Sequence, residues 1–203
     1  MQSDKTKQFQ WYQSRDRYSK ADERLQIALW YERTLKPTGY VVSTFLKPLE
    51  AQQAHRFVRR YFNIVARRFD THLIWEAYYD AHKYGTDNKI HYHIPYRDTE
   101  GTVPLEYMGA YWMAMLKASA NGTKRNLDKI ADRIVDKGLT RSTRYIVRCE
   151  RWKNIGEDDN AGTRFEYLHA THYNSIVGCG CPRRASKCRK NKCEERGLLA
   201  AYI

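Results

Sequence analysis

Two histidines separated by one tyrosine, His91-Tyr92-His93, lie within the stretch KIHYHIPYR at residues 89–97. The stretch alternates in the manner of a β-strand, so both histidines would point to one side and Tyr92 to the other. Two imidazoles at positions i and i+2 of a strand can converge on one ion, and imidazole is a common metal ligand. A metal centre is therefore the sharpest interpretation, with Pro95 expected to end the strand.

The triplet alone is weak evidence, because a chain with seven histidines produces such spacing by chance. The alternative is a pair of polar, structural residues on an ordinary strand. The surrounding sequence has to distinguish a metal site from a structural pair of histidines. THLIWEAYYDAH at 71–82 predicts the preceding strand, and KYGTDN predicts a turn between the two strands. Strand alternation places on one face of 71–82 the side chains of Glu76, Tyr78, Asp80 and His82.

The charge of the chain indicates a polyanionic partner. There are 36 Lys and Arg residues against 23 Asp and Glu, which gives a formal net charge of +13. Such a balance favours nucleic acid over a membrane surface, with a basic protein kept soluble by its charge as the alternative. The 16 tyrosines and five tryptophans favour nucleic acid further, because aromatic rings interleaved with basic residues stack unpaired bases.

Targeting features are missing from the sequence. The polar start MQSDKTKQFQ contains no apolar segment of a secretory peptide, and no run approaches the length of a membrane span. We therefore expect a cytoplasmic protein without a membrane partner, whose five cysteines are thiols or metal ligands.

The first half of the chain predicts alternating strands and helices. Residues 1–25 are expected to form an arm or a loosely held helix, and 27–31 a short strand. A β-branched and aromatic run over 40–48 predicts a strand. Helical spacing over 49–68 predicts a packed helix with a solvated basic face; the arginines directed toward solvent or a ligand are Arg59, Arg60, Arg67 and Arg68.

The second half predicts mainly helices. We expect a core helix over 105–119, a short amphipathic helix over 127–138, and a third helix from about Arg144, capped by Ser142 or Thr143. The order of strand, helix, hairpin and helices is typical of an α+β domain with a central, mainly antiparallel sheet flanked by helices.

Three segments in this order resemble the motifs of the HUH endonucleases, specifically the rolling-circle replication initiators (Rep proteins) of plasmids and single-stranded DNA viruses. VVSTFLKP resembles the first motif, HYHIPYR the His-hydrophobic-His metal motif, and RYIVRCERWK the Tyr-x-x-Lys motif. The tyrosine follows the histidines, as in initiators and single-tyrosine transposases, whereas it usually precedes them in relaxases. The resemblance implies an RRM-like nuclease domain over 39–155, between a basic arm at 1–38 and a Cys-rich basic extension at 156–203.

The resemblance also implies a role for each matching residue. Tyr145 would attack a DNA phosphodiester and form a 5′-phosphotyrosine, so that one strand is nicked and later rejoined at an origin. Tyr107 and Tyr111 are poorer candidates, since they follow the histidines closely in a core-like helix. Arg148 stands at the position of the family's lysine and keeps the positive charge. Cys149 stands where two-tyrosine members carry the second tyrosine, which implies a single-tyrosine enzyme.

The implied cofactor is Mg²⁺ or Mn²⁺, held by His91, His93 and a third ligand, with imidazole favouring manganese. Glu76 resembles the usual carboxylate position best, and Asp80 and His82 are the alternatives. A solvent-facing Glu76 paired with an arginine is the other interpretation of that residue. The DNA-contacting residues would be basic side chains near the tyrosine and in the extension: Arg144, Arg151, Lys153, Arg183 and Arg184.

A second group of residues could hold structural zinc. Cys179, Cys181, Cys188 and Cys193 follow the spacing C-x-C-x6-C-x4-C, and four thiolates on such short loops could close a tetrahedral site. The alternative is free thiols in a basic tail that contacts the DNA backbone.

The resemblance to replication initiators implies three partners, namely single-stranded origin DNA, a helicase and a polymerase. No phosphate-binding loop of the Gly-x-x-x-x-Gly-Lys-Ser/Thr type occurs in the chain, so unwinding is expected to come from a separate protein. Two alternatives stay open: a nucleic-acid-binding protein without enzymatic activity, and a single-tyrosine transposase that uses the same chemistry.

Overall fold

The computed structural model describes residues 35–81, 90–120, 126–138, 143, 145–153 and 174–182. Several predictions lie outside this part of the chain: most of the arm at 1–38, the strand at 27–31 and the segment 156–162. Six predicted site residues also lie outside it: His82, Arg144, Arg183, Arg184, Cys188 and Cys193. For Asp80 the structure describes the backbone alone.

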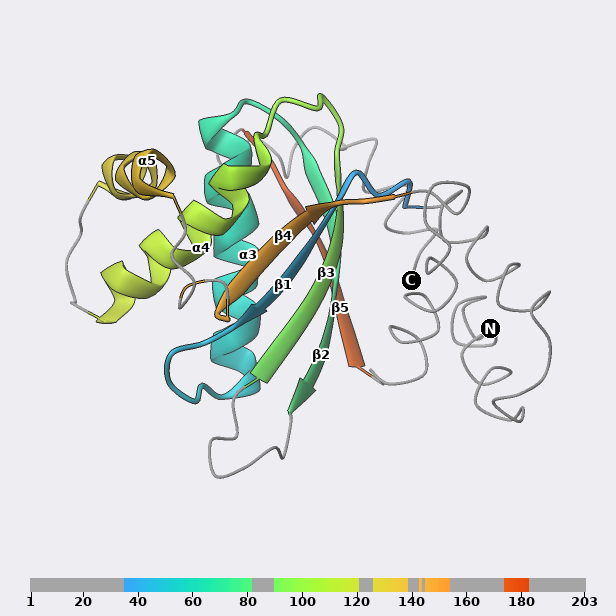
Figure 1. Ribbon diagram of the computed structural model, residues 1–203. Helices are drawn as coiled ribbons and strands as arrows, with labels where there is room; N and C mark the ends of the chain where they lie inside the picture. The colour runs from blue at the N-terminus through green and yellow to red at the C-terminus, as the bar shows by residue number, and fades with distance from the viewer. Residues whose placement is uncertain are drawn as a thin grey trace, which may run out of the picture.

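The described part is an α+β fold, which confirms the predicted class. Five strands form one sheet in the order β4-β1-β3-β2-β5, and every neighbouring pair is antiparallel (Figure 1). The strands are β1 (Gly39–Thr44), β2 (Leu73–Ala81), β3 (Ile90–Asp98), β4 (Val147–Arg151) and β5 (Asn174–Gly180). The helices are α3 (Ala51–Arg68), α4 (Leu105–Ala120) and α5 (Leu127–Lys137).

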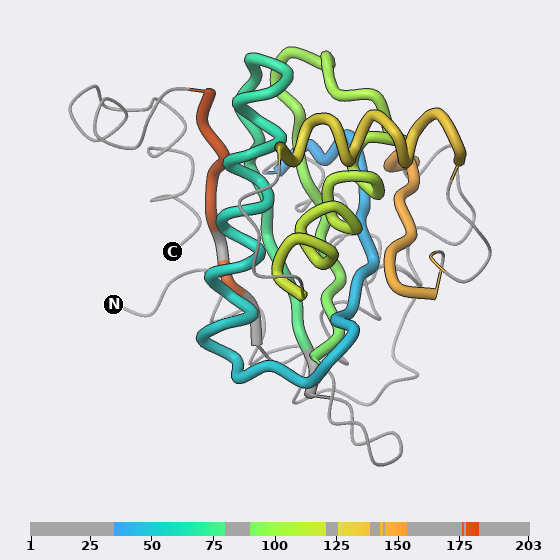
Figure 2. The backbone as a smooth tube through the Cα atoms, turned by 90° about the vertical axis from the view of Figure 1, so that its left-hand side faces the viewer, coloured from blue at the N-terminus to red at the C-terminus, as the bar shows by residue number. Residues whose placement is uncertain are grey.

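One face of the sheet packs against α3 and α4, and the helices lie together on that side (Figures 1 and 2). Strand alternation explains which residues take part. Tyr92 and Ile94 of β3 and Trp75 of β2 are fully buried in the core that α3 and α4 complete. The helix positions predicted from periodicity, among them Val58 and Val65, are also fully buried. Apolar residues therefore fix which face the helices cover.

The expectation that Pro95 ends its strand is wrong. β3 continues to Asp98, and Pro95 is opposite Tyr40 of β1. On the other side, the pairing of β3 with β2 covers residues 73–75 and 78–81 of β2 and is interrupted between them. A proline lacks the backbone N–H donor but keeps its carbonyl acceptor and an extended backbone. Strand β3 therefore loses its pairing with β2 over one short stretch and keeps its pairing with β1.

The prediction of a helix from about Arg144 is also wrong for most of that segment. Residues 147–151 form strand β4, which pairs with β1 at the edge of the sheet. Val147 is fully buried and Cys149 packs against the same core, so alternation over this segment has the strand period. The burial of Val147 and the packing of Cys149 against the core outweigh the local capping signal.

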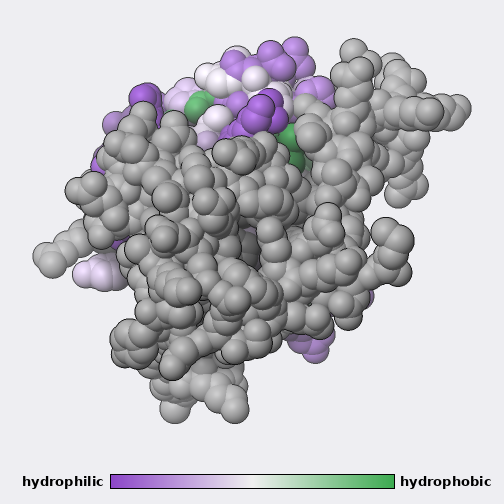
Figure 3. Space-filling view, turned by 90° about the vertical axis from the view of Figure 1, so that its right-hand side faces the viewer, coloured by the Kyte–Doolittle hydropathy of each residue, from purple (hydrophilic) through white to green (hydrophobic). Residues whose placement is uncertain are grey.

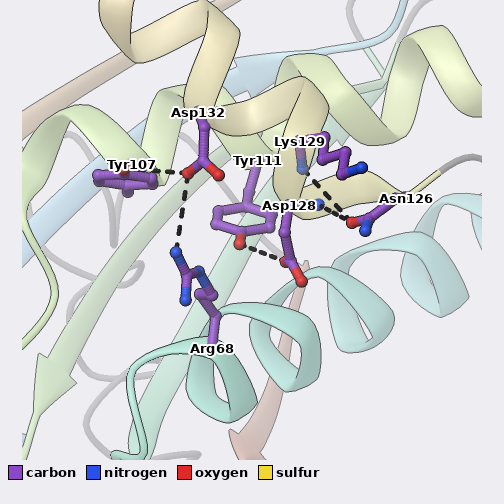
Figure 4. Close-up of polar contacts among 7 residues, drawn as sticks. All are labelled: Arg68, Tyr107, Tyr111, Asn126, Asp128, Lys129 and Asp132. Carbon is purple, nitrogen blue, oxygen red and sulfur yellow. Dashed lines mark hydrogen bonds and ion pairs between the residues drawn. The ribbon is translucent and has the colours of Figure 1, made fainter.

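Polar contacts join α5 to α4 and α3 (Figure 4). The Tyr107 hydroxyl donates to Asp132 at 3.1 Å, and the Tyr111 hydroxyl donates to Asp128 at 2.6 Å. Arg68 of α3 lies 3.8 Å from the Asp132 carboxylate. These contacts fix α5 against its neighbours and give Tyr107 and Tyr111 a structural role.

Strand β5 is fastened to α3. The backbone N–H of Cys181 donates to the Asn63 side-chain oxygen at 3.3 Å. At Gly180, a Cβ atom would lie only 2.4 Å from the Phe62 carbonyl oxygen of α3. The backbones therefore approach at a distance that only glycine allows.

Replacing this glycine should loosen the edge of the sheet. We expect Gly180→Ala to lower the free energy of unfolding by about 1–3 kcal/mol, because the backbone at Phe62 has to shift. Guanidinium denaturation measures the change. Lys117→Ala, at an exposed position of α4, is the control and should change the free energy by less than about 0.5 kcal/mol. Equal stability of Gly180→Ala and the parent would contradict this packing.

No helix in the described ranges is long and apolar enough to cross a membrane.

Candidate active site

The candidate site lies on the sheet face opposite α3 and α4, which we call the histidine face. Register aligns its residues in rows across the strands. One row contains Tyr78, His93, Val42 and Arg148. The next row toward the end of β1 contains Asp80, His91 and Thr44. Neighbouring strands lie about 4.8 Å apart, so each row is a set of adjacent positions.

The two histidines lie together, as the sequence predicts. Their ring centroids are 4.6 Å apart, and the rings meet edge to face. His93 is buried and His91 is partly exposed. The predicted alternation of side chains along this strand is also present, since Ile90, Tyr92 and Ile94 pack in the core on the other face.

Tyr40 holds His93 in place and was not predicted. The Tyr40 hydroxyl lies 2.5 Å from His93 Nδ1, and both residues are buried. In the tautomer whose Nδ1–H donates to the Tyr40 oxygen, the imidazole lone pair is on Nε2, the atom that would bind a metal ion. The sequence contained one signal for this contact: Tyr40 opens the strand that resembles the first motif.

The candidate third ligands take different places along β2. Asp80 is directly opposite His91 in the register, whereas Glu76 lies two residues beyond Tyr78, which is opposite His93. Glu76 is fully buried, so the interpretation as a solvent-facing carboxylate is wrong. Within the described ranges, no three His, Cys, Asp or Glu side chains form a group that could hold a metal ion. The structure thus brings two imidazoles together, and Asp80 is nearer to them in register than Glu76.

Arg148 shares the histidine face. It lies on edge strand β4 in the same row as His93, with Val42 between them. Its guanidinium forms an ion pair with Glu150 at 2.6 Å and is largely exposed. A guanidinium at this place can fork onto a phosphate that approaches the sheet from the histidine face.

Tyr145 lies in the turn that leads into β4. The N–H of Thr44 donates to the Ile146 carbonyl at 2.9 Å, which fastens this turn to the end of β1. Thr44 is opposite His91, so the turn lies at the His91 end of the sheet. The Tyr145 side chain is 76% exposed, and the other large exposed apolar side chain of the described residues is Leu46. Tyr145 is therefore accessible to a large substrate.

Figure 3 views the molecule from the side of the histidine face, and the described residues visible in it lie mainly along the upper edge and are mostly hydrophilic. Arg151 and Lys153, two predicted DNA contacts, are exposed at the end of β4 and just beyond it. Trp152 between them is buried, and its backbone N–H donates to the Thr38 carbonyl. The two basic side chains are thus displayed on a fixed backbone.

Cys149 points away from the histidine face. It is opposite Val41 and packs against the core. Burial raises the pKa of its thiol to about 12, and the neighbouring Glu150 carboxylate adds to the rise. Position 149 therefore cannot present a side chain to a substrate bound at His91 and His93.

This pKa predicts an unreactive thiol. At pH 8, iodoacetamide should modify Cys149 about 1000-fold more slowly in the folded protein than in guanidinium, because the ordinary thiol pKa is 9.0 and the thiolate is the nucleophile. Peptide mass spectrometry measures the rate at this residue. The raised pKa also predicts that stability falls as pH rises from about 9 toward 12, where the unfolded chain loses the proton first. Equal rates in the two states would contradict the burial.

Two of the four clustered cysteines lie in the described part. Cys179 and Cys181 have their sulfur atoms 3.9 Å apart at the end of β5. Two thiolates of one tetrahedral zinc ion lie about 3.8 Å apart, given Zn–S bonds of about 2.3 Å. The separation therefore suits two ligands of one zinc ion.

Comparison of this chain with protein-family models, curated proteins and solved structures found no match.

Proposed function

We propose that this protein is a metal-assisted endonuclease of the HUH type that nicks and rejoins single-stranded DNA at a replication origin through Tyr145. One observation carries the proposal: an imidazole pair on a central strand and an exposed tyrosine lie at the same end of one sheet. Arg148 on the same face adds a cation for the phosphate. The sequence motifs supply the same residues in the same order.

The donor set on the histidine face fits Mn²⁺ or Mg²⁺ in part. His91 and His93 would be two ligands, and the chemistry of a carboxylate suits the third. We propose Asp80 for this role because it is opposite His91, with Glu76 as the alternative. The bound ion would polarise the scissile phosphate. Tyr40 would act through His93: its hydroxyl oxygen would accept a hydrogen bond from Nδ1–H and so orient Nε2 toward the ligand position.

The reaction at Tyr145 exchanges one phosphoester bond for another. Its hydroxyl loses a proton, the phenolic oxygen bonds to phosphorus, and the bond from phosphorus to the 3′ oxygen breaks. The departing 3′ oxygen takes up a proton. The products are a 5′-phosphotyrosine and a free 3′-hydroxyl, which a polymerase can extend. Attack by a 3′-hydroxyl on the phosphotyrosine restores the DNA strand and the tyrosine.

The apolar surface near Tyr145 suits an unpaired strand. Leu46 follows β1 closely in the chain and is 45% exposed, at the end of the sheet to which the Tyr145 turn is fastened. Unstacked bases can lie against such side chains, while duplex DNA keeps its bases inside. We propose single-stranded DNA as the substrate for this reason, with a separate helicase to provide it.

A gel assay tests the proposal. Single-stranded oligonucleotides that represent all short sequence contexts are labelled at the 3′ end and incubated with the protein and Mn²⁺. We expect a labelled adduct of protein and DNA that survives denaturant, together with an unlabelled fragment that ends in a 3′-hydroxyl. Absence of an adduct with every single-stranded substrate would overturn the proposal.

A nucleic-acid-binding protein without catalysis is the second candidate. It is favoured by one observation: His93 is buried and lies 2.5 Å from the Tyr40 hydroxyl, a contact that a structural histidine would also make. In that case His91 and His93 would be structural, and single-stranded DNA would bind reversibly without forming the adduct.

A further inference from the structure

The outer side of α3 carries positive charge that the described part of the chain does not neutralise. Over its 18 residues, this helix contains five arginines and no Asp or Glu. Arg68 pairs with Asp132 of α5. For Arg56, Arg59, Arg60 and Arg67, the described part of the chain provides no carboxylate partner, and all four are exposed.

Helical geometry aligns these side chains. With 3.6 residues per turn, Arg56, Arg60 and Arg67 lie within about 40° of one another around the helix axis, and Arg59 lies about 60° to one side. At 1.5 Å per residue, the stripe from Arg56 to Arg67 is about 16 Å long. We call these four residues the arginine stripe.

The stripe is held on a rigid support. The opposite side of α3 is buried against the sheet through the side chains of Ala54, Val58, Tyr61, Phe62, Val65 and Ala66. Asn63, between Arg60 and Arg67, accepts the bond from the Cys181 N–H. Figure 2 shows α3 running along β5. A ligand would therefore meet arginines whose backbone positions are already fixed.

Helix α5, on the same side of the sheet, provides a contrast (Figure 1). Its Lys129, Arg133 and Lys137 are exposed, but they alternate with three aspartates, so the charges of this helix cancel. The solvated surface of an ordinary helix has this mixed composition. The uncompensated charge of α3 is consequently a property of that helix rather than of helix surfaces in this chain.

We propose that the arginine stripe binds the phosphate backbone of duplex DNA, as a second nucleic-acid surface on the side of the sheet opposite the histidine face. The exposed side chains of α3 are arginine, glutamine and alanine. Its partly buried rings, His55 and Phe57, pack against neighbouring aromatic side chains of the fold. Single strands are bound by ring stacking, whereas phosphate contacts alone suit a duplex and do not depend on base sequence.

The stripe is long enough to meet several phosphates. Duplex DNA carries one negative charge for about each 1.7 Å of its axis, so about 16 Å of helix surface spans enough phosphates to engage all four side chains. In an origin, this surface would hold the paired DNA beside a single-stranded segment. The inference concerns equilibrium binding and does not depend on nicking by Tyr145.

The test compares two triple variants with the same loss of charge. One carries Arg56→Gln, Arg60→Gln and Arg67→Gln, and the other carries Lys129→Gln, Arg133→Gln and Lys137→Gln. Binding of a labelled 20-base-pair duplex of arbitrary sequence is measured by fluorescence anisotropy over a range of salt concentrations. Glutamine has nearly the same helix propensity as arginine, and thermal denaturation verifies folding.

We expect the α3 variant to bind duplex at least tenfold more weakly at 0.1 M salt. The slope of log K against log salt should become smaller by about 2 to 3, since each phosphate contact contributes about 0.9. The α5 variant should stay within about twofold of the parent. A third variant with lysine at the three α3 positions should keep most of the affinity, because phosphate contacts depend on charge.

Three results would overturn the proposal: equal losses in the α3 and α5 variants, a loss in the lysine variant as large as with glutamine, or a greater loss for a single strand than for the duplex. Adduct formation on a short single strand is measured in parallel. The α3 variant should retain adduct formation. Failure of the duplex-binding proposal therefore gives a different pattern of results from failure of the nuclease proposal.

Discussion

Tyr145→Phe should abolish the covalent adduct between this protein and single-stranded DNA. The substitution removes one hydroxyl from a side chain that is 76% exposed, so folding should be unchanged. Without the hydroxyl, no phosphotyrosine can form at this position, and we expect adduct formation to fall by at least about 10³-fold. The rate is measured with the 3′-labelled oligonucleotide in the presence of Mn²⁺.

Tyr107→Phe is the matched control. It also removes one tyrosine hydroxyl, but that hydroxyl donates to Asp132 between helices α4 and α5. This variant should keep the adduct and lose only a little stability. Reversible binding of the same oligonucleotide should persist in Tyr145→Phe, which separates loss of chemistry from loss of binding. An adduct formed by Tyr145→Phe at the parent rate would assign the nucleophile to another residue.

His91→Ala and His93→Ala should each weaken Mn²⁺ binding at least tenfold. The two rings lie 4.6 Å apart on one face, so an ion held by both loses a ligand in either variant. Isothermal titration of the metal-depleted protein with Mn²⁺ gives the affinity without reference to catalysis. His72→Ala, directly before β2 and at the end of the sheet opposite to His91, should bind Mn²⁺ as the parent does. Unchanged affinity in both variants would leave the pair as structural residues.

The same titration distinguishes the third ligand. Register places Asp80 opposite His91, and Glu76 lies farther along β2. We therefore expect Asp80→Asn to weaken Mn²⁺ binding more than Glu76→Gln does. The reverse order would assign the role to Glu76, and its buried carboxylate would then be the ligand.

Sequence alone predicted the helical and hairpin core well. The helix over 49–68 and the strands over 71–82 and 89–97 correspond to α3, β2 and β3 within one or two residues at most boundaries. Their hydrophobic periods are long and regular, and each period matches one buried face. The parity of His91 and His93 follows from the same alternation.

Two local signals misled the prediction because long-range pairing outweighs them. Thr143 and its neighbours form a good helix cap, but the segment after them pairs with β1 and buries Val147. Pro95 is a strand breaker in isolation, yet β3 continues through it because β1 still pairs on its other side. The Tyr40 contact with His93 depends on the register between β1 and β3, which no local pattern specifies.

The alternation of β4 restricts how this protein could evolve. Arg148 faces outward toward the histidine face, while Cys149 faces the core. The substitution Cys149→Tyr would therefore direct a bulky ring toward the core and would not place a hydroxyl on the histidine face. If one residue were inserted before β4 and the pairing with β1 were kept, each side chain of β4 would point to the opposite face of the sheet. A second tyrosine on the histidine face at this point of the chain thus requires an insertion rather than a substitution.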